Sequence, residues 1–456
     1  MAASERKNRN VLVIAYSFPP RSSSGSIRND KLLRNLSTFG WNLQVLTVKE
    51  KYFLKTGSGS RRISDTDNIE IIRTNCFYTQ DFVVKLKNFI LKQKTAELPE
   101  VQSTMSDAND TPLKKITKIQ KLKDFITDFI TVPDKNIGWF PFALVAGIKI
   151  MRKGKVNLIY AIGKPWTGLL IGYSLKLIYK KPLVIDFMDP WMGITWRWSK
   201  GNLLDKIQFF LEKLIVKRSD FIIANTEELG KDFIERLKVS QEKTGVITCG
   251  YDEDDFNENI HQIKDEQFVI THTGSFYSKR NPINFLKAVK QLTDNKLIPE
   301  NQIRINFIGA LKIKDPALLK LIAEPPFTKI LHMESWVPHS KAIEYLYLSD
   351  VLFILQPDTF LQIPAKLYEY IFTQKPILAI AQKNGALDNI IKNEGWGKTI
   401  ENNDIEGIAD TVSDFYQEFK TGNLKTKIDE KSIQSYSVKS LAYKLGCLFE
   451  EILNRR

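Results

Sequence analysis

Cysteine is scarce in this sequence, because its 456 residues include only Cys76, Cys249 and Cys447. These residues lie far apart and show no C-x-x-C spacing, which argues against a disulfide framework and against a zinc or redox motif. Histidine is also rare, with four residues and no i, i+4 pair, so the sequence predicts no metal site. We therefore expect a protein of the reducing cytoplasm.

Long apolar runs are missing as well. No stretch reaches the roughly 18 uninterrupted apolar residues of a membrane-spanning helix, so none is expected. Residues 1–7 are polar and lead almost directly into the apolar run 11–15, which predicts no signal peptide. Neither a G-x-G-x-x-G pattern nor a Walker lysine follows that run, and this argues against a dinucleotide-dependent dehydrogenase and a P-loop ATPase.

Positive charge is in surplus, with 66 Lys and Arg against 52 Asp and Glu and a formal net charge of +14. Such a surplus suits nucleic acid, an anionic membrane surface or nucleotide phosphates. The lysines are scattered and no DNA- or RNA-binding motif is present, so a nucleic-acid-binding protein remains only an alternative. The basic amphipathic segment 82–94 is a candidate contact with anionic lipid, or else a helix packed on its own domain.

Short apolar runs alternate with helical patterns along the whole chain, which is typical of parallel α/β sheets. The predicted strands are 11–15, 43–48, 69–73, 158–161, 182–186 and 221–224, then 268–273, 303–308, 329–332, 351–355 and 376–379. The predicted helices include 26–39, 282–293 and 342–349. We predict an α/β protein with two doubly wound domains, 1–256 with an insertion at about 80–130, and 257–431, followed by a helix in 432–456.

The stretch Gln362-Ile-Pro-Ala-Lys-Leu-Tyr-Glu-Tyr follows a buried strand of the second domain. We expect Ala365, Lys366 and Leu367 to open a helix whose free N–H groups and dipole favour a diphosphate, with Lys366 adding a full charge. Glu369, on the same helical face, is spaced to accept hydrogen bonds from a ribose diol. An ordinary i, i+3 Lys–Glu surface pair is the alternative.

A second candidate anion site follows the strand 268–273. Gly274 and Ser275 end this strand, and a glycine there lets a ligand approach the backbone closely. Lys279 or Arg280 is placed to reach a phosphate, because ligands of open α/β sheets bind at the carboxyl ends of strands. A solvated basic turn is the alternative.

The first domain offers two candidate loops after its strands. Phe18-Pro-Pro-Arg-Ser-Ser-Ser-Gly-Ser contains Ser24 and Gly25, and we expect a flexible loop of backbone donors there. Val184-Ile-Asp-Phe-Met-Asp-Pro-Trp places Asp186 and Asp189 at a strand end. Together with Trp191, Trp196 and Trp198 they suggest a platform for a sugar or an apolar acceptor, or alternatively a capped turn with a packed tryptophan.

Two weaker signals have ordinary explanations. Asp252-Glu-Asp-Asp contains a D-x-D pattern of the kind that binds manganese, but we favour a solvated loop between the domains. Val337 and His339 follow a strand of the second domain, where they would edge a base pocket, although a core or surface histidine is the default interpretation.

In this order the motifs resemble glycosyltransferase family 4, whose fold is GT-B, and the resemblance covers nearly the whole chain. The matching pieces are Phe18-Pro-Pro with its small-residue loop, Asp186-Phe-Met-Asp-Pro-Trp, Ala224-Asn-Thr, Gly250-Tyr-Asp, Thr273-Gly-Ser-Phe-Tyr with Arg280, and Pro364-Ala-Lys-Leu-Tyr-Glu-Tyr. The resemblance implies two Rossmann-like domains facing across a cleft, with the helix of 432–456 crossing back to the first domain.

The resemblance also implies roles. Lys366 and Arg280 would hold the donor diphosphate as an electrophilic clamp, Glu369 the ribose, and the Gly25 loop would lie near the phosphates and the reacting sugar. Asp189 is a candidate to orient the acceptor hydroxyl. The expected enzyme is a retaining, metal-independent transferase that uses a nucleotide-sugar as co-substrate and no other cofactor.

By the same resemblance, the acceptor would be a glycan or a polyprenyl-linked sugar in the synthesis of bacterial surface polysaccharide or glycolipid. The enzyme would lie in the cytoplasm, with the inner face of the cell membrane as a candidate surface. A nucleotide-sugar epimerase on the same fold, which needs no acceptor, is the alternative enzyme.

The sequence departs from the family at two positions. The family's paired glutamates are separated by seven residues, and Leu361 stands where the first of them would be, eight residues before Glu369. A histidine found in many first domains is absent from Gly163-Lys-Pro-Trp-Thr-Gly. The first departure leaves recognition of the donor sugar unassigned, and the second leaves no catalytic group to infer in that loop.

Overall fold

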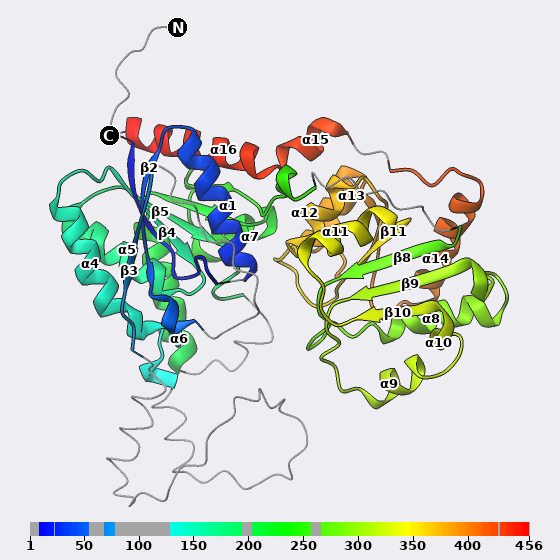
Figure 1. Cartoon of the computed structure of the whole chain (residues 1–456). Helices are drawn as coiled ribbons and strands as arrows, with labels where there is room; N and C mark the ends of the chain where they lie inside the picture. The colour runs from blue at the N-terminus through cyan, green and yellow to red at the C-terminus, as the bar shows by residue number, and fades with distance from the viewer. Residues whose placement is uncertain are drawn as a thin grey trace, which may run out of the picture.

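The chain forms two parallel sheets of seven and six strands in a computed structural model (Figure 1). The structure describes residues 9–21, 23–53, 68–77, 128–193, 203–256, 266–426 and 429–455. The predicted α/β class with two doubly wound halves is confirmed. The amphipathic segment 82–94 lies outside the described residues.

The first sheet is built from β3 (Ile69–Thr74), β2 (Asn42–Val48), β1 (Asn10–Ile14), β4 (Leu158–Gly163), β5 (Leu183–Phe187), β6 (Phe221–Ala224) and β7 (Thr244–Val246), in this spatial order. Its main helices are α1 (Ser24–Thr38), α4 (Phe140–Arg152), α5 (Thr167–Tyr179), α6 (Leu203–Arg218) and α7 (Glu227–Leu237). Short 3₁₀ turns are η1 (Glu50–Tyr52), η2 (Ile137–Trp139), η3 (Gln241–Lys243) and η4 (Glu253–Phe256).

The second sheet is built from β10 (Leu331–Glu334), β9 (Ile303–Ile308), β8 (Phe268–Thr273), β11 (Val351–Gln356), β12 (Ile377–Ala381) and β13 (Gly397–Ile400). Its helices are α8 (Ile283–Asp294), α9 (Pro316–Ile322), α10 (Phe327–Ile330), α11 (His339–Leu348), α12 (Lys366–Phe372), α13 (Ala386–Glu394) and α14 (Ile405–Lys420), with the 3₁₀ turn η5 (Glu300–Gln302). The helices α15 (Glu430–Ser435) and α16 (Val438–Asn454) follow.

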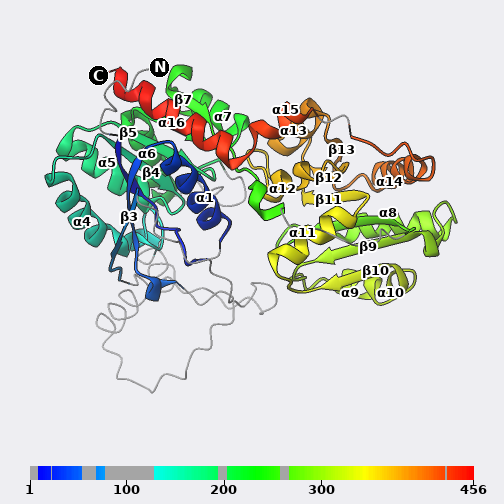
Figure 2. The ribbon, with the colours of Figure 1, turned by 45° about the horizontal axis from the view of Figure 1, so that its top comes forward.

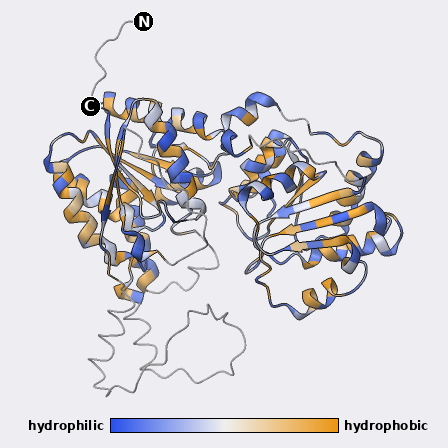
Figure 3. Ribbon diagram, viewed as in Figure 1, coloured by the Kyte–Doolittle hydropathy of each residue, from blue (hydrophilic) through white to orange (hydrophobic). Residues whose placement is uncertain are grey.

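Each sheet is covered by helices on both faces. Along β1, Leu12 and Ile14 face a core shared with α4 to α7, whereas Val11 and Val13 face a core shared with α1 and α16. All four side chains are buried, as expected of a parallel sheet between two helical layers. Figure 3 shows the apolar residues of the first half concentrated in its strands.

The final helix α16 returns to the first half of the molecule. It packs along α1, and the Phe449 ring meets the Trp41 ring edge to face at 5.4 Å between centroids. Gly446 of α16 lies so close to Trp41 that an added Cβ would be 3.0 Å from the indole nitrogen. Figures 1 and 2 show α15 and α16 running along the same side of both halves. The two halves are thus joined by this segment as well as by the chain after β7.

Several predicted elements differ in detail. The strand predicted at 329–332 was wrong in its start, because α10 occupies Phe327–Ile330 and β10 begins only at Leu331. Sequence reasoning missed β7 and β13, which are short and half-buried throughout. Among the described residues, no helix is long and apolar enough to cross a membrane.

Candidate functional site

Lys366, the first residue of α12, reaches the end of β8. Its Nζ donates a hydrogen bond to the Thr273 carbonyl and lies 3.1 Å from His272 Nε2. The His272 ring is buried, and its Nδ1 lies 2.8 Å from the Phe353 carbonyl oxygen, so Nδ1 is the donor and Nε2 the acceptor. Burial lowers the pKa of His272 well below its ordinary value, and the neighbouring Lys366 cation lowers it further. His272 is therefore a neutral acceptor that holds the lysine.

Two cations share this corner of the second half. Burial, together with the positive charge of Arg280, lowers the pKa of Lys366 to about 7 against the opposing effect of Glu369. The Arg280 guanidinium lies over the ring of Tyr277, 4.8 Å from its centroid. Desolvation and like charge both disfavour protonated Lys366, and the attraction of a bound anion would offset them. The pair has the properties of a polyanion site.

Gly274 brings its backbone close to Lys366. Its φ of +105° is unfavourable for other residues, and an added Cβ would lie 2.7 Å from Lys366 Nζ. Its N–H donates to the Ile308 carbonyl at 2.6 Å, and an added Cβ on Gly309 would lie 2.4 Å from the Gly274 carbonyl carbon. The neighbouring Ser275 is half-buried. The loops after β8 and β9 thus meet backbone to backbone beside the two cations.

Glu369 lies one turn after Lys366 but is bonded elsewhere. Its Oε1 lies 3.1 Å from Nε2 of His339, the first residue of α11. Glu369 and Ala365 line a small cleft of about 100 Å³ together with Ser24 of α1, so the two halves meet here. Val337 is half-buried in the loop that leads to His339. The predicted ribose carboxylate therefore borders the space between the halves.

The prediction for Leu367 needs correction. Its side chain is fully buried in the core beneath α12, and its backbone N–H donates to the Pro364 carbonyl at 3.0 Å. Because that N–H is hydrogen-bonded within the turn that starts the helix, Leu367 cannot donate it to a phosphate.

Ser24 and Gly25 also differ from expectation. They form the first turn of α1 rather than a flexible loop, because Ser23 caps the helix by accepting a hydrogen bond from the Ser26 N–H at 3.3 Å. Ser24 is exposed, and a Cβ added to Gly25 would touch Met188 at 3.4 Å. These residues therefore present a fixed helix N-terminus to the space between the halves.

Asp186 does not line the site and is corrected to a structural residue. It is fully buried, lies 2.9 Å from the Arg28 guanidinium, and accepts a hydrogen bond from the Tyr160 hydroxyl. Arg28 also donates to the Ile247 carbonyl at 2.9 Å. The cluster ties α1 and β5 to the chain leaving the first sheet. Sequence reasoning missed Arg28, since nothing local marks a partner 158 residues away.

Asp189 does lie at the junction of the halves. Its Oδ1 accepts a hydrogen bond from Gln362 Nε2 at 2.5 Å, and its Oδ2 lies 3.6 Å from Lys164 Nζ. Trp191 takes no part in a platform, because it is buried and stacked on Trp166 with 5.3 Å between ring centroids. Trp196 and Trp198 lie outside the described residues.

Leu361, which replaces the first glutamate of the family pattern, bonds to the first half. Its carbonyl accepts a hydrogen bond from the Thr226 hydroxyl at 2.8 Å. Its side chain packs against the first core, and its Cδ1 would lie 3.5 Å from a Cβ added at Gly193. The position thus contributes an apolar contact between the halves.

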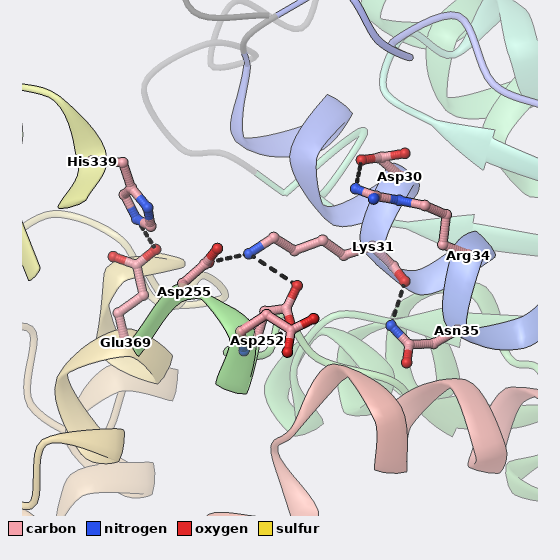
Figure 4. A network of polar contacts seen from close by, with 9 residues as sticks. Asp30, Lys31, Arg34, Asn35, Asp252, Asp255, His339 and Glu369 are labelled. Carbon is pink, nitrogen blue, oxygen red and sulfur yellow. Dashed lines mark hydrogen bonds and ion pairs between the residues drawn. The ribbon is translucent and has the colours of Figure 1, made fainter. Parts of the chain in front are cut away.

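The acidic loop after β7 is anchored rather than merely solvated. Lys31 of α1 pairs with Asp255 and lies 3.5 Å from Asp252 (Figure 4). Asp252 and Asp255 of this acidic loop therefore form an ion bridge that fixes the connecting chain on α1.

Comparison with known proteins agrees with this architecture. The model of Glycosyltransferase Family 4 matches residues 116–255. The chain is 25% identical over 279 residues to the UDP-Gal:alpha-D-GlcNAc-diphosphoundecaprenol alpha-1,3-galactosyltransferase of Escherichia coli, across 59% of this chain and 69% of that protein.

Two solved structures superpose over nearly the full length. Sucrose-phosphate synthase of Thermosynechococcus elongatus gives a TM-score of 0.64 at 15% identity, covering 98% of this chain and 100% of the other. The Anabaena protein HepE in complex with UDP gives 0.54 at 12% identity, covering 98% of each chain. The family match over residues 116–255, the galactosyltransferase relative and the shared GT-B fold together support a glycosyltransferase similar to those of family 4.

Proposed function

We propose that the enzyme transfers a hexose from a UDP-sugar to a lipid-linked sugar acceptor. The observation that carries this proposal is the pair of cations, Lys366 and Arg280, held beside the half-buried backbone of Gly274. The Escherichia coli relative uses UDP-Gal and a diphosphoundecaprenol-linked sugar, and HepE was solved with UDP, which supports the donor and acceptor classes.

The donor would span the space between the halves. Its diphosphate would contact Lys366 and Arg280, its ribose Glu369, and its base the chain at Val337. The sugar would then point toward the helix N-terminus at Ser24 and Gly25, which supplies partial positive charge from the first half. Asp189, already at the junction through Gln362, would orient the acceptor hydroxyl.

The proposed reaction depends on stabilising the negative charge that develops on the leaving UDP. As the bond between the anomeric carbon and the β-phosphate oxygen breaks, negative charge develops on UDP and the sugar becomes oxocarbenium-like. Lys366 and Arg280 are fixed by the surrounding fold and would stabilise that charge without reorganising, which removes the need for a metal ion. In a retaining reaction the acceptor oxygen bonds to the same face of the sugar, and its proton passes to the departing phosphate.

The acceptor class suggests where the enzyme works. A sugar on a polyprenyl diphosphate is confined to a membrane surface, so an enzyme using it would bind that surface peripherally. The product would then belong to surface polysaccharide or glycolipid synthesis.

A transfer assay tests the proposal. Purified enzyme is incubated with UDP-Gal, UDP-glucose or UDP-N-acetylglucosamine and a GlcNAc-diphospholipid, with and without EDTA, and NMR gives the anomeric configuration of the product. We expect an EDTA-resistant, retained product, and Lys366→Ala or Arg280→Ala should each lower the rate by about 100-fold. Lys279→Ala is the matched control, because this exposed lysine of the same loop pairs with Asp358 at 3.5 Å.

Two outcomes would contradict the proposal. Equal rates for wild type and Lys366→Ala would exclude the cation pair as the diphosphate site. Conversion of a UDP-sugar without acceptor would instead favour the epimerase alternative.

A further inference from the structure

Lys366 and Glu369 occupy i, i+3 positions on α12, where opposite charges normally pair. In the part of the chain that the structure describes, no ion pair joins them. Lys366 turns to Thr273 and His272, whereas Glu369 turns to His339. Because their partners differ, Lys366 and Glu369 do not neutralise each other. The cation stays available to a phosphate, and the carboxylate stays available to hydroxyl groups.

His339 is placed to do this for Glu369. It opens α11 directly after Pro338, and its Nε2 lies 3.1 Å from Glu369 Oε1. Among the described residues, no other side chain hydrogen-bonds to Glu369. One carboxylate oxygen is thus held by the imidazole, and Oε2 is left to accept a hydrogen bond from a ligand.

The charges around this pair favour a protonated imidazole. Hydrogen bonding to Glu369 raises the pKa of His339 above its ordinary value, the negative charges of Glu369 and Asp255 raise it further, and burial and Lys31 oppose them. Asp255 belongs to the loop anchored on Lys31, and Figure 4 shows this ion bridge beside the His339–Glu369 pair. A protonated His339 forms a charge-assisted bond, which fixes the carboxylate more firmly than a neutral donor would.

We infer that His339 is a positioning residue for the reaction: it fixes the Glu369 carboxylate so that Oε2 accepts the ribose hydroxyls of the UDP-sugar. This rests on the proposed function, because it assumes that UDP is the donor nucleotide. His339 itself contacts neither the diphosphate nor the reacting carbon. Replacing His339 should therefore weaken the binding only of ligands that carry ribose hydroxyls.

Calorimetric titration with two ligands isolates this effect. UDP and 2′,3′-dideoxy-UDP share base and diphosphate and differ only in the ribose hydroxyls. His339→Ala should weaken UDP binding by about tenfold, the size expected for losing a hydrogen bond to a charged group, and leave dideoxy-UDP unchanged. His339→Gln, which keeps an N–H donor, should restore most of the UDP affinity.

The chain offers a matched control in His332. Its Nε2 also lies 3.1 Å from a glutamate, Glu334, on the same sheet, but outside the proposed site. His332→Ala should leave both affinities unchanged.

The outcomes separate the inference from the proposed function. If wild type binds UDP and His339→Ala binds it equally well, or loses UDP and dideoxy-UDP alike, His339 does not position Glu369 and the inference falls while the UDP site stands. If wild type binds no UDP, the proposed function and the inference fall together.

Discussion

The ammonium group of Lys366 lies 3.1 Å from His272 Nε2, and the Phe353 carbonyl holds the other nitrogen of that ring at 2.8 Å. The ring thus presents Nε2 to the lysine as an acceptor, and burial together with the Lys366 charge lowers the pKa of His272 and keeps the ring neutral. Lys366 is buried against neutral groups, and the charges of Arg280 and Glu369 shift its pKa in opposite directions. Its charge state is therefore sensitive to an arriving anion.

UDP binding should take up a proton at alkaline pH. The pKa of free Lys366 is about 7, so the lysine is largely neutral at pH 8, and a bound diphosphate would return it to the charged form. We expect uptake of about one proton at pH 8, with affinity falling roughly tenfold per pH unit above the free pKa. Calorimetry in two buffers of different ionisation enthalpy measures this.

The matching control is Lys366→Met, which should bind UDP weakly and without proton uptake. Identical binding heats in both buffers for wild type would contradict the prediction. The lowered pKa of Lys366 also makes the free energy of unfolding depend on pH. Between pH 7 and 10.5 the unfolded chain binds more protons at this lysine than the folded chain does. The contribution of Lys366 to the free energy of unfolding therefore rises with pH across that window.

Gly274→Ala should damage the site more than the fold. The new Cβ would meet Lys366 Nζ at 2.7 Å, and the φ of +105° is unfavourable for alanine. Gly422→Ala is the control, because Gly422 has a φ of +69° but nothing within 4 Å of an added Cβ. Urea unfolding should show a loss of about 1–2 kcal/mol in each variant from backbone strain.

UDP affinity distinguishes the two glycine variants. It should fall at least about tenfold in Gly274→Ala, since a displacement near 1 Å is enough for such a loss, and stay unchanged in Gly422→Ala. Equal affinities in both would mean that Lys366 does not hold the ligand.

Sequence reasoning named candidate residues where a local pattern and a chemical property coincide. Gly274 and Lys366 come after strands that begin with apolar residues and are buried over their whole length, and the apolar runs also predicted the sheets. It failed for Asp186, because an internal ion pair with Arg28 cannot be told from an exposed carboxylate without knowing the packing. His339 was set aside for the same reason, since its partner Glu369 lies 30 residues away.

Breaking the internal ion pair should cost far more than breaking an exposed one. Arg28→Met would leave the Asp186 carboxylate buried with the Tyr160 hydroxyl as its one remaining partner among the described residues, and such losses amount to about 3–5 kcal/mol. Lys290→Met removes an exposed i, i+4 pair with Asp294 at 2.9 Å and should cost less than about 0.5 kcal/mol. Urea unfolding compares them, and a loss below about 1 kcal/mol for Arg28→Met would contradict the buried-charge argument.

Restoring the family's acid at Leu361 should impair the enzyme rather than improve it. The Leu361 side chain packs on the first core near Gly193. A Cβ added at Gly193 would also lie 3.8 Å from an Asp232 carboxylate oxygen. A glutamate at position 361 would therefore bring a charge into an apolar contact close to another carboxylate. Burying such a group costs about 1–3 kcal/mol, which would weaken the junction between the halves. We expect Leu361→Glu to lower the transfer rate at least about tenfold.

UDP affinity should stay unchanged in Leu361→Glu, because Lys366 and Arg280 are untouched, and Leu361→Met should keep full activity as the apolar control. The two measurements together locate the defect in the sugar-transfer step rather than in nucleotide binding. A faster Leu361→Glu enzyme would instead mean that a carboxylate at this position can still reach the donor sugar, and that the contact with Thr226 opens when the substrate binds.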